Sequence, residues 1–187
     1  MKKRVSGFTL VELVVVIVVL GILAVTALPK YLNLQRDARI AAVHGAAGAL
    51  HDAAKLAYSK AAIDGIENEG RSGPKSPPYS ETNLGILELK RGYPEAYAED
   101  GGVGIIQLTD FGGFVPEDGS GASTDWDICY ASRSGNCYPE GATGNGEVRV
   151  GFDILEDDLR KCRVRYIEAE DKGFPDAYQI IIETQDC

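Results

Sequence analysis

The sequence has few of the residues and motifs on which most enzymes and nucleic-acid-binding proteins rely. It contains only two histidines in 187 residues, and neither has a convincing nucleophile partner for acid–base or covalent catalysis. The glycine-rich stretch 101–104 lacks the Lys-Ser/Thr of a phosphate-binding loop. A formal charge of −9 without a basic stripe argues against nucleic acid as a partner. We therefore expect neither an enzyme nor a cofactor-binding protein.

What the sequence does have is a long apolar run from Phe8 to Leu28. About 20 apolar residues are needed for a helix to cross the hydrocarbon of a bilayer, and within lipid such a segment must be helical. Glu12 is its single ionisable side chain. Because a carboxylate at membrane depth costs roughly 2.5–3.5 kcal/mol, it is usually functional. The run predicts a membrane-spanning helix with a specific use for Glu12.

A short basic segment, residues 1–7, precedes this run and ends in Gly7. The sequence Gly7-Phe8-Thr9-Leu10-Val11-Glu12 resembles the processing site of type IV pilins and pseudopilins. The resemblance implies cleavage between Gly7 and Phe8 by a prepilin peptidase, which also methylates the new N-terminus at Phe8. Loss of Lys2, Lys3 and Arg4 would lower the net charge from −9 to −12.

Cleavage would create a new amine at Phe8, for which Glu12 is the natural partner. Four residues of helix bring the two groups within reach inside one chain, and the residues themselves do not choose between this pairing and one between neighbouring chains. A carboxyl that stays protonated in lipid is a third reading. The resemblance favours pairing between subunits, which would set their axial stagger.

Residues 30–39 and 58–63 resemble those of the type IVa, mannose-sensitive haemagglutinin pilins. The head of this chain matches that subtype only loosely, most recognisably at Gly92-Tyr93-Pro94. This resemblance implies the major subunit of a homopolymeric fibre that is stored in the bacterial inner membrane and assembled outside the cell. The implied partners are the assembly machinery with its ATPase, and host or abiotic surfaces in adhesion and biofilm formation. Two alternatives remain: a pseudopilin of a type II secretion system, and a pilin whose head binds mannose-type glycans.

The helix is expected to extend beyond the membrane-spanning run. Pro29 and Gly21 predict a kink or local melting. A second, amphipathic half then extends to residue 63, with an apolar stripe that consists of Ile40, Val43, Ala47, Leu50, Ala54, Ala57 and Ala61. Asp64-Gly65 is the predicted end. The expected domains are the leader 1–7, the helix 8–63 (8–28 and 29–63) and a globular head 64–187.

The head reads as a series of strands joined by loops. Residues 66–83 are expected to be an exposed loop and 104–110 a short helix. We predict strands at 84–89, 127–131, 147–152, 162–168 and 178–184, with a helical turn at 154–160. Successive hairpins after a long helix indicate the α+β class, with an antiparallel sheet on the helix, as in the type IV pilin fold.

The four cysteines, Cys129, Cys137, Cys162 and Cys187, lie in the last third of the chain. An even number behind an export segment is typical of disulfides, and no C-x-x-C spacing suggests zinc. Of the three possible connectivities we favour Cys129–Cys137 and Cys162–Cys187. The second fits a hairpin in which Tyr166 faces Ile182 and Arg165 faces Glu183.

We predict no metal site of regular spacing. His44 and His51 are separated by about 10.5 Å of helical rise, too far to share one ion. A weak calcium site is a minor alternative, at the acidic loop that contains Glu168, Glu170, Asp171 and Asp176. An exposed aromatic residue in the head is the candidate for stacking on a glycan.

Overall fold

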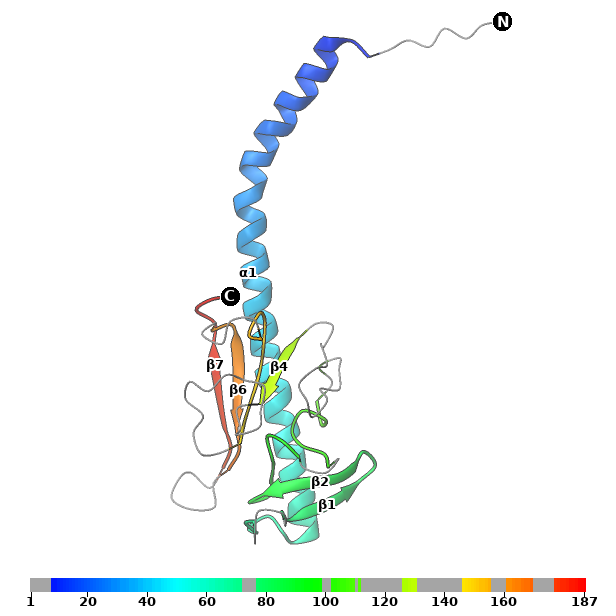
Figure 1. Ribbon diagram of the computed structural model, residues 1–187, viewed down its shortest axis with the longest axis vertical. Coiled ribbons are helices and arrows are strands. Elements are labelled where there is room, and N and C mark those ends of the chain that lie inside the picture. The colour runs from blue at the N-terminus through cyan, green and yellow to red at the C-terminus, as the bar shows by residue number, and fades with distance from the viewer. Residues whose placement is uncertain are drawn as a thin grey trace, which may run out of the picture. The chain divides into compact units, whose positions relative to one another are not determined.

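The computed structural model describes residues 8–71, 77–98, 102–109, 111, 126–130, 146–155, 161–169 and 177–187. These residues form one long helix, α1, followed by strands β1 to β7 (Figure 1). The chain divides into two compact units between Ala38 and Arg39. Each unit is described by itself.

The first unit holds the beginning of α1, which extends from Leu10 to Asp64. The helix is unbroken through Gly21 and Pro29, so the local melting expected at Pro29 does not occur. Loss of one hydrogen bond at a proline is tolerated when the flanking turns retain theirs. Whether the axis bends at either residue stays a prediction.

The second unit contains the rest of α1, whose end matches the prediction. Asp64 is the last helical residue, and Gly65 adopts a φ of 75°. The backbone N–H of Ile66 donates to the carbonyl oxygen of Ala61 at 3.0 Å, and Ile66 also packs against the apolar cluster that contains Ala61. This arrangement is a Schellman motif, in which glycine supplies the left-handed residue and an apolar contact closes the helix end.

The predicted stripe on α1 is the face that packs into the head. Its buried members are Val43, Ala46, Ala47, Leu50, Ala53, Ala54, Ala57 and Ala61. Ile40, predicted to lie within the stripe, is only half-buried. Ala46 and Ala53 were not part of the predicted stripe, which is therefore wider than expected. Because six of the eight buried residues are alanines, the opposing strands and loops can pack close to the helix backbone.

Seven strands form two antiparallel sheets in the described part of the head. The first sheet has the order β1 (Tyr79–Thr82), β2 (Gly85–Lys90), β3 (Tyr93–Pro94). The second has the order β4 (Asp127–Tyr130), β5 (Glu147–Gly151), β6 (Arg163–Ile167), β7 (Gln179–Glu183). One face of the second sheet joins α1 in a common core that includes Ile128, Val148, Val150, Val164 and Tyr166. The fold is α+β, as predicted.

Three local predictions were wrong. β1 lies in a segment predicted to be loop, because the polar sequence Tyr79–Thr82 gains its strand conformation from pairing with β2. β3 is only two residues long and was missed. Residues 105–108 form hydrogen-bonded turns and not a helix, while Asp110, like residues 156–160 of the predicted helical turn, lies outside the described residues.

The β6–β7 hairpin is antiparallel, but its register differs from the predicted one by two residues. Tyr166 lies opposite Ile180 and Arg163 opposite Glu183. The Arg163 Nε atom donates to Glu183 at 2.6 Å, so the opposite-charge pair forms with a different arginine. A shift of two residues leaves every side chain on its predicted face.

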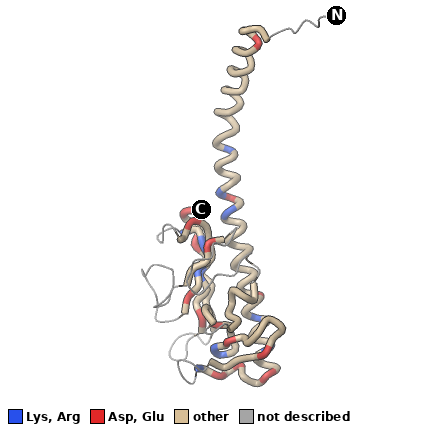
Figure 2. The backbone as a smooth tube through the Cα atoms, turned by 45° about the vertical axis from the view of Figure 1, so that its right-hand side comes forward, with Lys and Arg blue, Asp and Glu red and all other residues tan. Residues whose placement is uncertain are grey.

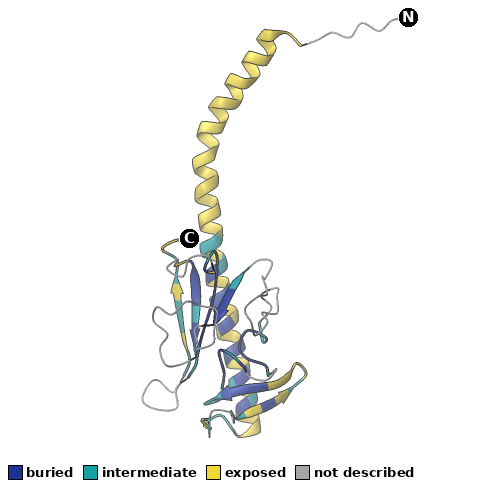
Figure 3. Cartoon of the chain, in the orientation of Figure 1, coloured by how far each residue is buried: buried dark blue, intermediate teal, exposed yellow. Residues whose placement is uncertain are grey.

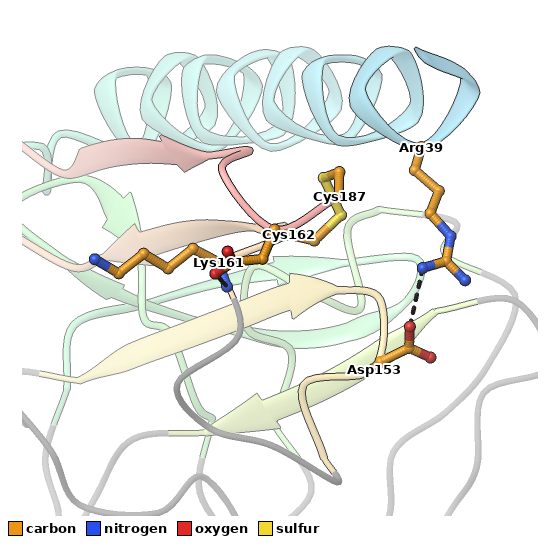
Figure 4. Close-up of a disulfide and its surroundings, with 6 residues drawn as sticks. Arg39, Asp153, Lys161, Cys162 and Cys187 are labelled. Atoms are coloured by element: carbon orange, nitrogen blue, oxygen red, sulfur yellow. Dashed lines mark hydrogen bonds and ion pairs between the residues drawn. A yellow bond between two sulfur atoms is a disulfide. The ribbon is translucent and has the colours of Figure 1, made fainter. Parts of the chain in front are cut away.

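The Cys162–Cys187 disulfide is confirmed, with the two Cα atoms 4.7 Å apart. Figure 4 shows it beside Lys161, at the start of β6. The Lys161 carbonyl accepts a hydrogen bond from the N–H of Asp186 at 3.2 Å, and the Lys161 N–H donates to the Asp186 carboxylate at 2.9 Å. Cys129 is also in a disulfide. Its predicted partner, Cys137, lies outside the described residues, so that pairing stays a prediction.

Candidate assembly site

The first unit presents a long apolar surface along residues 8–28. Its large hydrophobic side chains range in exposure from 44% at Val14 to 88% at Phe8, and all of residues 8–38 are exposed (Figure 3). Within the described residues, α1 is the one helix long and apolar enough to cross a membrane. Because so much apolar area costs roughly 25 cal/mol per Å² in water, this surface requires either lipid or another protein as its surroundings.

Glu12 lies at the beginning of this surface and closes the N-terminus of α1. Both the backbone N–H and the hydroxyl of Thr9 donate to Glu12 Oε2 at 2.8 Å. In return, the Glu12 N–H donates to Thr9 Oγ1 at 3.3 Å. This is a capping box, which satisfies backbone donors that the first helical turn leaves without partners.

The role of Thr9 was missed in the sequence analysis, although the signal is present. Thr9-x-x-Glu12 before an apolar run is the sequence signature of a capping box. The carboxylate of Glu12 also lies where the positive end of the helix dipole favours a negative charge. Glu12 is therefore held by its own chain before any partner arrives.

Gly7, on the leader side of the predicted cleavage, lies outside the described residues, whereas Phe8 precedes the capping box and is almost fully exposed. Cleavage would place a new amine at Phe8, one residue from Thr9. The predicted pairing of that amine with Glu12 remains a proposal.

Charges are distributed differently in the second unit, where acidic positions occur throughout the head (Figure 2). Three glutamates, Glu88, Glu95 and Glu168, interact in its interior. Burial raises the pKa of Glu95 to about 8, and the negative charge of Glu168 adds to this effect, although Arg71 lies only 2.8 Å from it.

Glu168, from the proposed calcium loop, serves the head itself. Its carboxylate accepts hydrogen bonds from the N–H groups of Ala96 and Gly146 and from Lys90 Nζ, at 3.0 to 3.3 Å. The other candidate ligands, Glu170, Asp171 and Asp176, lie outside the described residues. Among described residues no group of three or more His, Cys, Asp or Glu side chains is arranged so that it could hold a metal ion.

The candidates for ligand binding are largely engaged in packing. His51 contacts the Tyr178 hydroxyl. Trp126 packs between two phenylalanine rings, with centroids 5.8 Å from Phe111 and 4.7 Å from Phe152. These contacts explain the aromatic residues as anchors between elements, and they give no particular support to a glycan platform.

Comparison with known proteins bears on the N-terminal segment. Residues 2–28 match the family model for the prokaryotic N-terminal methylation motif. The chain carries that motif. The matched segment contains Gly7, Phe8 and Glu12, the three residues singled out by the sequence analysis.

Curated relatives extend the similarity beyond this segment. The chain is 41% identical over 58 residues to the type IV narrow pilus major component PilA5 of Thermus thermophilus, which is 31% of this chain and 50% of that protein. It is 31% identical over 109 residues to two fimbrial proteins of Pseudomonas aeruginosa, covering 58% of this chain and 62% of each relative. The chain thus spans between half and about three fifths of these relatives. No solved structure matches it significantly.

Together these matches support the type IV pilin family. They do not distinguish the mannose-sensitive haemagglutinin subtype from other members.

Proposed function

We propose that this chain is the major structural subunit of a type IV pilus, of the mannose-sensitive haemagglutinin kind, and not an enzyme. Its precursor is a single-pass protein of the bacterial inner membrane, and the mature subunit polymerises into an extracellular fibre for attachment, adhesion and biofilm formation. The coincidence that supports this proposal most is a methylation motif on an exposed apolar helical segment, residues 8–28, with one carboxylate in its first turn.

The chain would be organised as a leader 1–7, a helix 8–63 and a head 64–187. A prepilin peptidase would cut between Gly7 and Phe8 and methylate Phe8. The subunit would then have a cationic N-terminus at the end of an apolar surface, close to Glu12. Residues 8–28 would form the fibre core, because packing against identical helices satisfies a surface that the head leaves uncovered.

Glu12 has two possible partners in this mechanism. In the single chain its carboxylate caps its own helix through Thr9. In the fibre it would also meet the Phe8 amine of a neighbour, and the two charges would neutralise each other in an apolar core. An ion pair removed from water requires good geometry and remaining hydrogen bonds, and Thr9 supplies the latter.

Two substitutions separate capping from charge pairing. Glu12→Gln retains a side-chain oxygen that can accept from Thr9 but removes the charge, whereas Glu12→Ala removes both. We expect both variants to be inserted and processed, and both to produce few or no fibres by electron microscopy. Glu81→Gln, on an exposed strand position, is the matched control. Normal fibres from Glu12→Gln would show that capping alone is needed.

The wider proposal has independent tests. Mass spectrometry of purified surface fibres should report N-methylated Phe8 as the first residue of this chain. Deletion of the gene for this chain should abolish the fibres and leave protein secretion intact. Loss of secretion with fibres retained would instead indicate a secretion pseudopilin. Binding of the soluble head, residues 36–187, on a glycan array would assign glycan binding to this subunit.

A further inference from the structure

Among the residues that the structure describes, the edge of the larger sheet is open at β7. β6 is the only described strand that neighbours β7 in the sheet order. Within the described part of the chain, the strand pairs with β6 alone, and the other backbone hydrogen bonds do not include residues 179–183. One row of backbone donors and acceptors along β7 therefore faces outward, and Figure 3 shows this strand as half-buried or exposed along its length.

β7 lacks the features that normally protect such an edge. Its sequence, Gln179-Ile180-Ile181-Ile182-Glu183, contains no lysine and no proline, and its pairing with β6 is continuous without a bulge. Glu183 is engaged by Arg163 of the neighbouring strand, so its charge is neutralised within the sheet. Three consecutive β-branched residues without a free charge are a template for strand addition.

The sequence of β7 is complementary to itself. If two copies pair antiparallel about Ile181, Ile180 of each lies opposite Ile182 of the other, and Gln179 lies opposite Glu183. Ile180 and Ile182 are both on the face that packs toward α1, since they lie opposite Tyr166 and Val164. The register therefore joins apolar side chains on one face and an amide to a carboxylate at each end.

We propose that β7 pairs with β7 of a second copy of this chain, joining two four-stranded sheets into one continuous sheet. The contact is isologous, with a two-fold axis at Ile181 perpendicular to the sheet. The α1 segments that pack on the two sheets then lie on the same side and run in opposite directions.

This geometry specifies which copies can meet, on the basis of the proposed function. Subunits of one polar fibre all have the same orientation, so a two-fold contact cannot join successive subunits. It joins heads of two different fibres. A single strand pair is smaller than the roughly 1,000 Å² of a stable interface, so each contact is weak. Repetition along two fibres makes their lateral association strong.

Substitution at the axis tests the pairing. Ile181→Lys places a charge on the open edge, a known guard against strand addition, and Ile86→Lys changes an isoleucine of β2 that is 53% exposed. We expect Ile181→Lys cells to produce normal numbers of fibres with at least a severalfold loss of lateral bundles by electron microscopy. Ile86→Lys fibres should bundle like the parent. Equal bundling by both variants would overturn the pairing, whereas absence of parental fibres would refute the proposed function instead.

A cross-link tests the same contact directly, even if Ile181→Lys prevents assembly. Opposed residues of antiparallel strands have Cα atoms about 4.5–5.5 Å apart, within the range of a disulfide. Ile181→Cys in the full chain on cells should therefore give a covalent dimer under mild oxidation on a non-reducing gel. Ile86→Cys should not. Absence of the Ile181→Cys dimer, or equal dimerisation of both variants, would refute the two-fold contact.

Discussion

Arg165 donates to both carboxylate oxygens of Glu147, from Nε at 2.6 Å and from Nη2 at 2.8 Å. The same glutamate accepts from Arg149 Nε at 2.7 Å. Arg149 and Arg165 lie directly opposite each other on β5 and β6, where like charges are unfavourable. Glu147 thus neutralises a repulsion that the strand register creates. Although burial opposes it, the hydrogen bonds from the two arginines hold the pKa of Glu147 below its usual value.

Glu147→Gln should therefore destabilise the head. The change leaves two opposed guanidinium groups without the carboxylate between them, and breaking a buried ion pair by removing one partner is strongly unfavourable. Because Arg165 is partly exposed, we expect a loss of roughly 2–3 kcal/mol in the free energy of unfolding. Chemical denaturation in detergent, followed by the near-ultraviolet circular dichroism of the tyrosines, measures this loss. Glu81→Gln, on an exposed position of β1, should change stability by less than about 0.5 kcal/mol.

Glu95 predicts a fall in stability as pH rises from about 5 to about 8. Its pKa rises from an ordinary 4.5 to about 8 on folding, so the folded state holds a proton that the unfolded chain releases. Its contribution to stability is fully present below pH 4.5 and is lost as pH rises through 8. The melting temperature should fall between about pH 5 and pH 8. Glu95→Gln should flatten that slope, and an unchanged slope would contradict the raised pKa.

The Cys162–Cys187 disulfide should contribute substantially to the stability of the head. It closes a loop with a sequence separation of 25 residues, for which chain entropy predicts about 3.5 kcal/mol. The double variant Cys162→Ala/Cys187→Ala should lose this amount in chemical denaturation while Cys129 remains oxidised. A loss below about 1 kcal/mol would show that the Lys161–Asp186 hydrogen bonds hold the chain end without the disulfide.

Two leucines on α1 form a matched pair that tests the orientation of the helix. Leu50 is fully buried, whereas Leu56 is 72% exposed. Leu50→Ala should cost about 3 kcal/mol through lost burial and a residual cavity. Leu56→Ala should cost less than about 0.5 kcal/mol, because this side chain is exposed. Both changes have the same effect on helix propensity, so the difference between them reports burial. Similar losses in thermal unfolding would contradict the observed orientation of α1.

The features predictable from the sequence were those determined by local chemistry. The helix end at Asp64-Gly65 followed from the conformational freedom of glycine, and the buried stripe through Leu50 followed from periodicity. The Thr9–Glu12 capping box was equally readable, since its spacing is visible in the sequence. It was missed because Glu12 was interpreted as a partner for an amine or as a protonated carboxyl in lipid, and not as a helix cap.

Features that depend on distant segments could not be predicted. The strand β1 has no apolar alternation of its own, and its conformation is stabilised by pairing with β2. The β6–β7 register was wrong by two residues because two arginines, Arg163 and Arg165, are equally suitable partners for Glu183 in the sequence. Packing of both strands in the sheet, rather than the charge pattern alone, determines which one is opposite.

The exposed surface of residues 10–28 has a consequence for energetics. A segment that leaves the bilayer for the interior of a fibre exchanges hydrocarbon tails for the side chains of other copies, and both are similarly apolar. The transfer free energy of these side chains therefore changes little in either direction. In the proposed function, an external motor can drive extraction or return with modest work, and the electrostatics at Glu12 decide the direction in which the exchange is favourable.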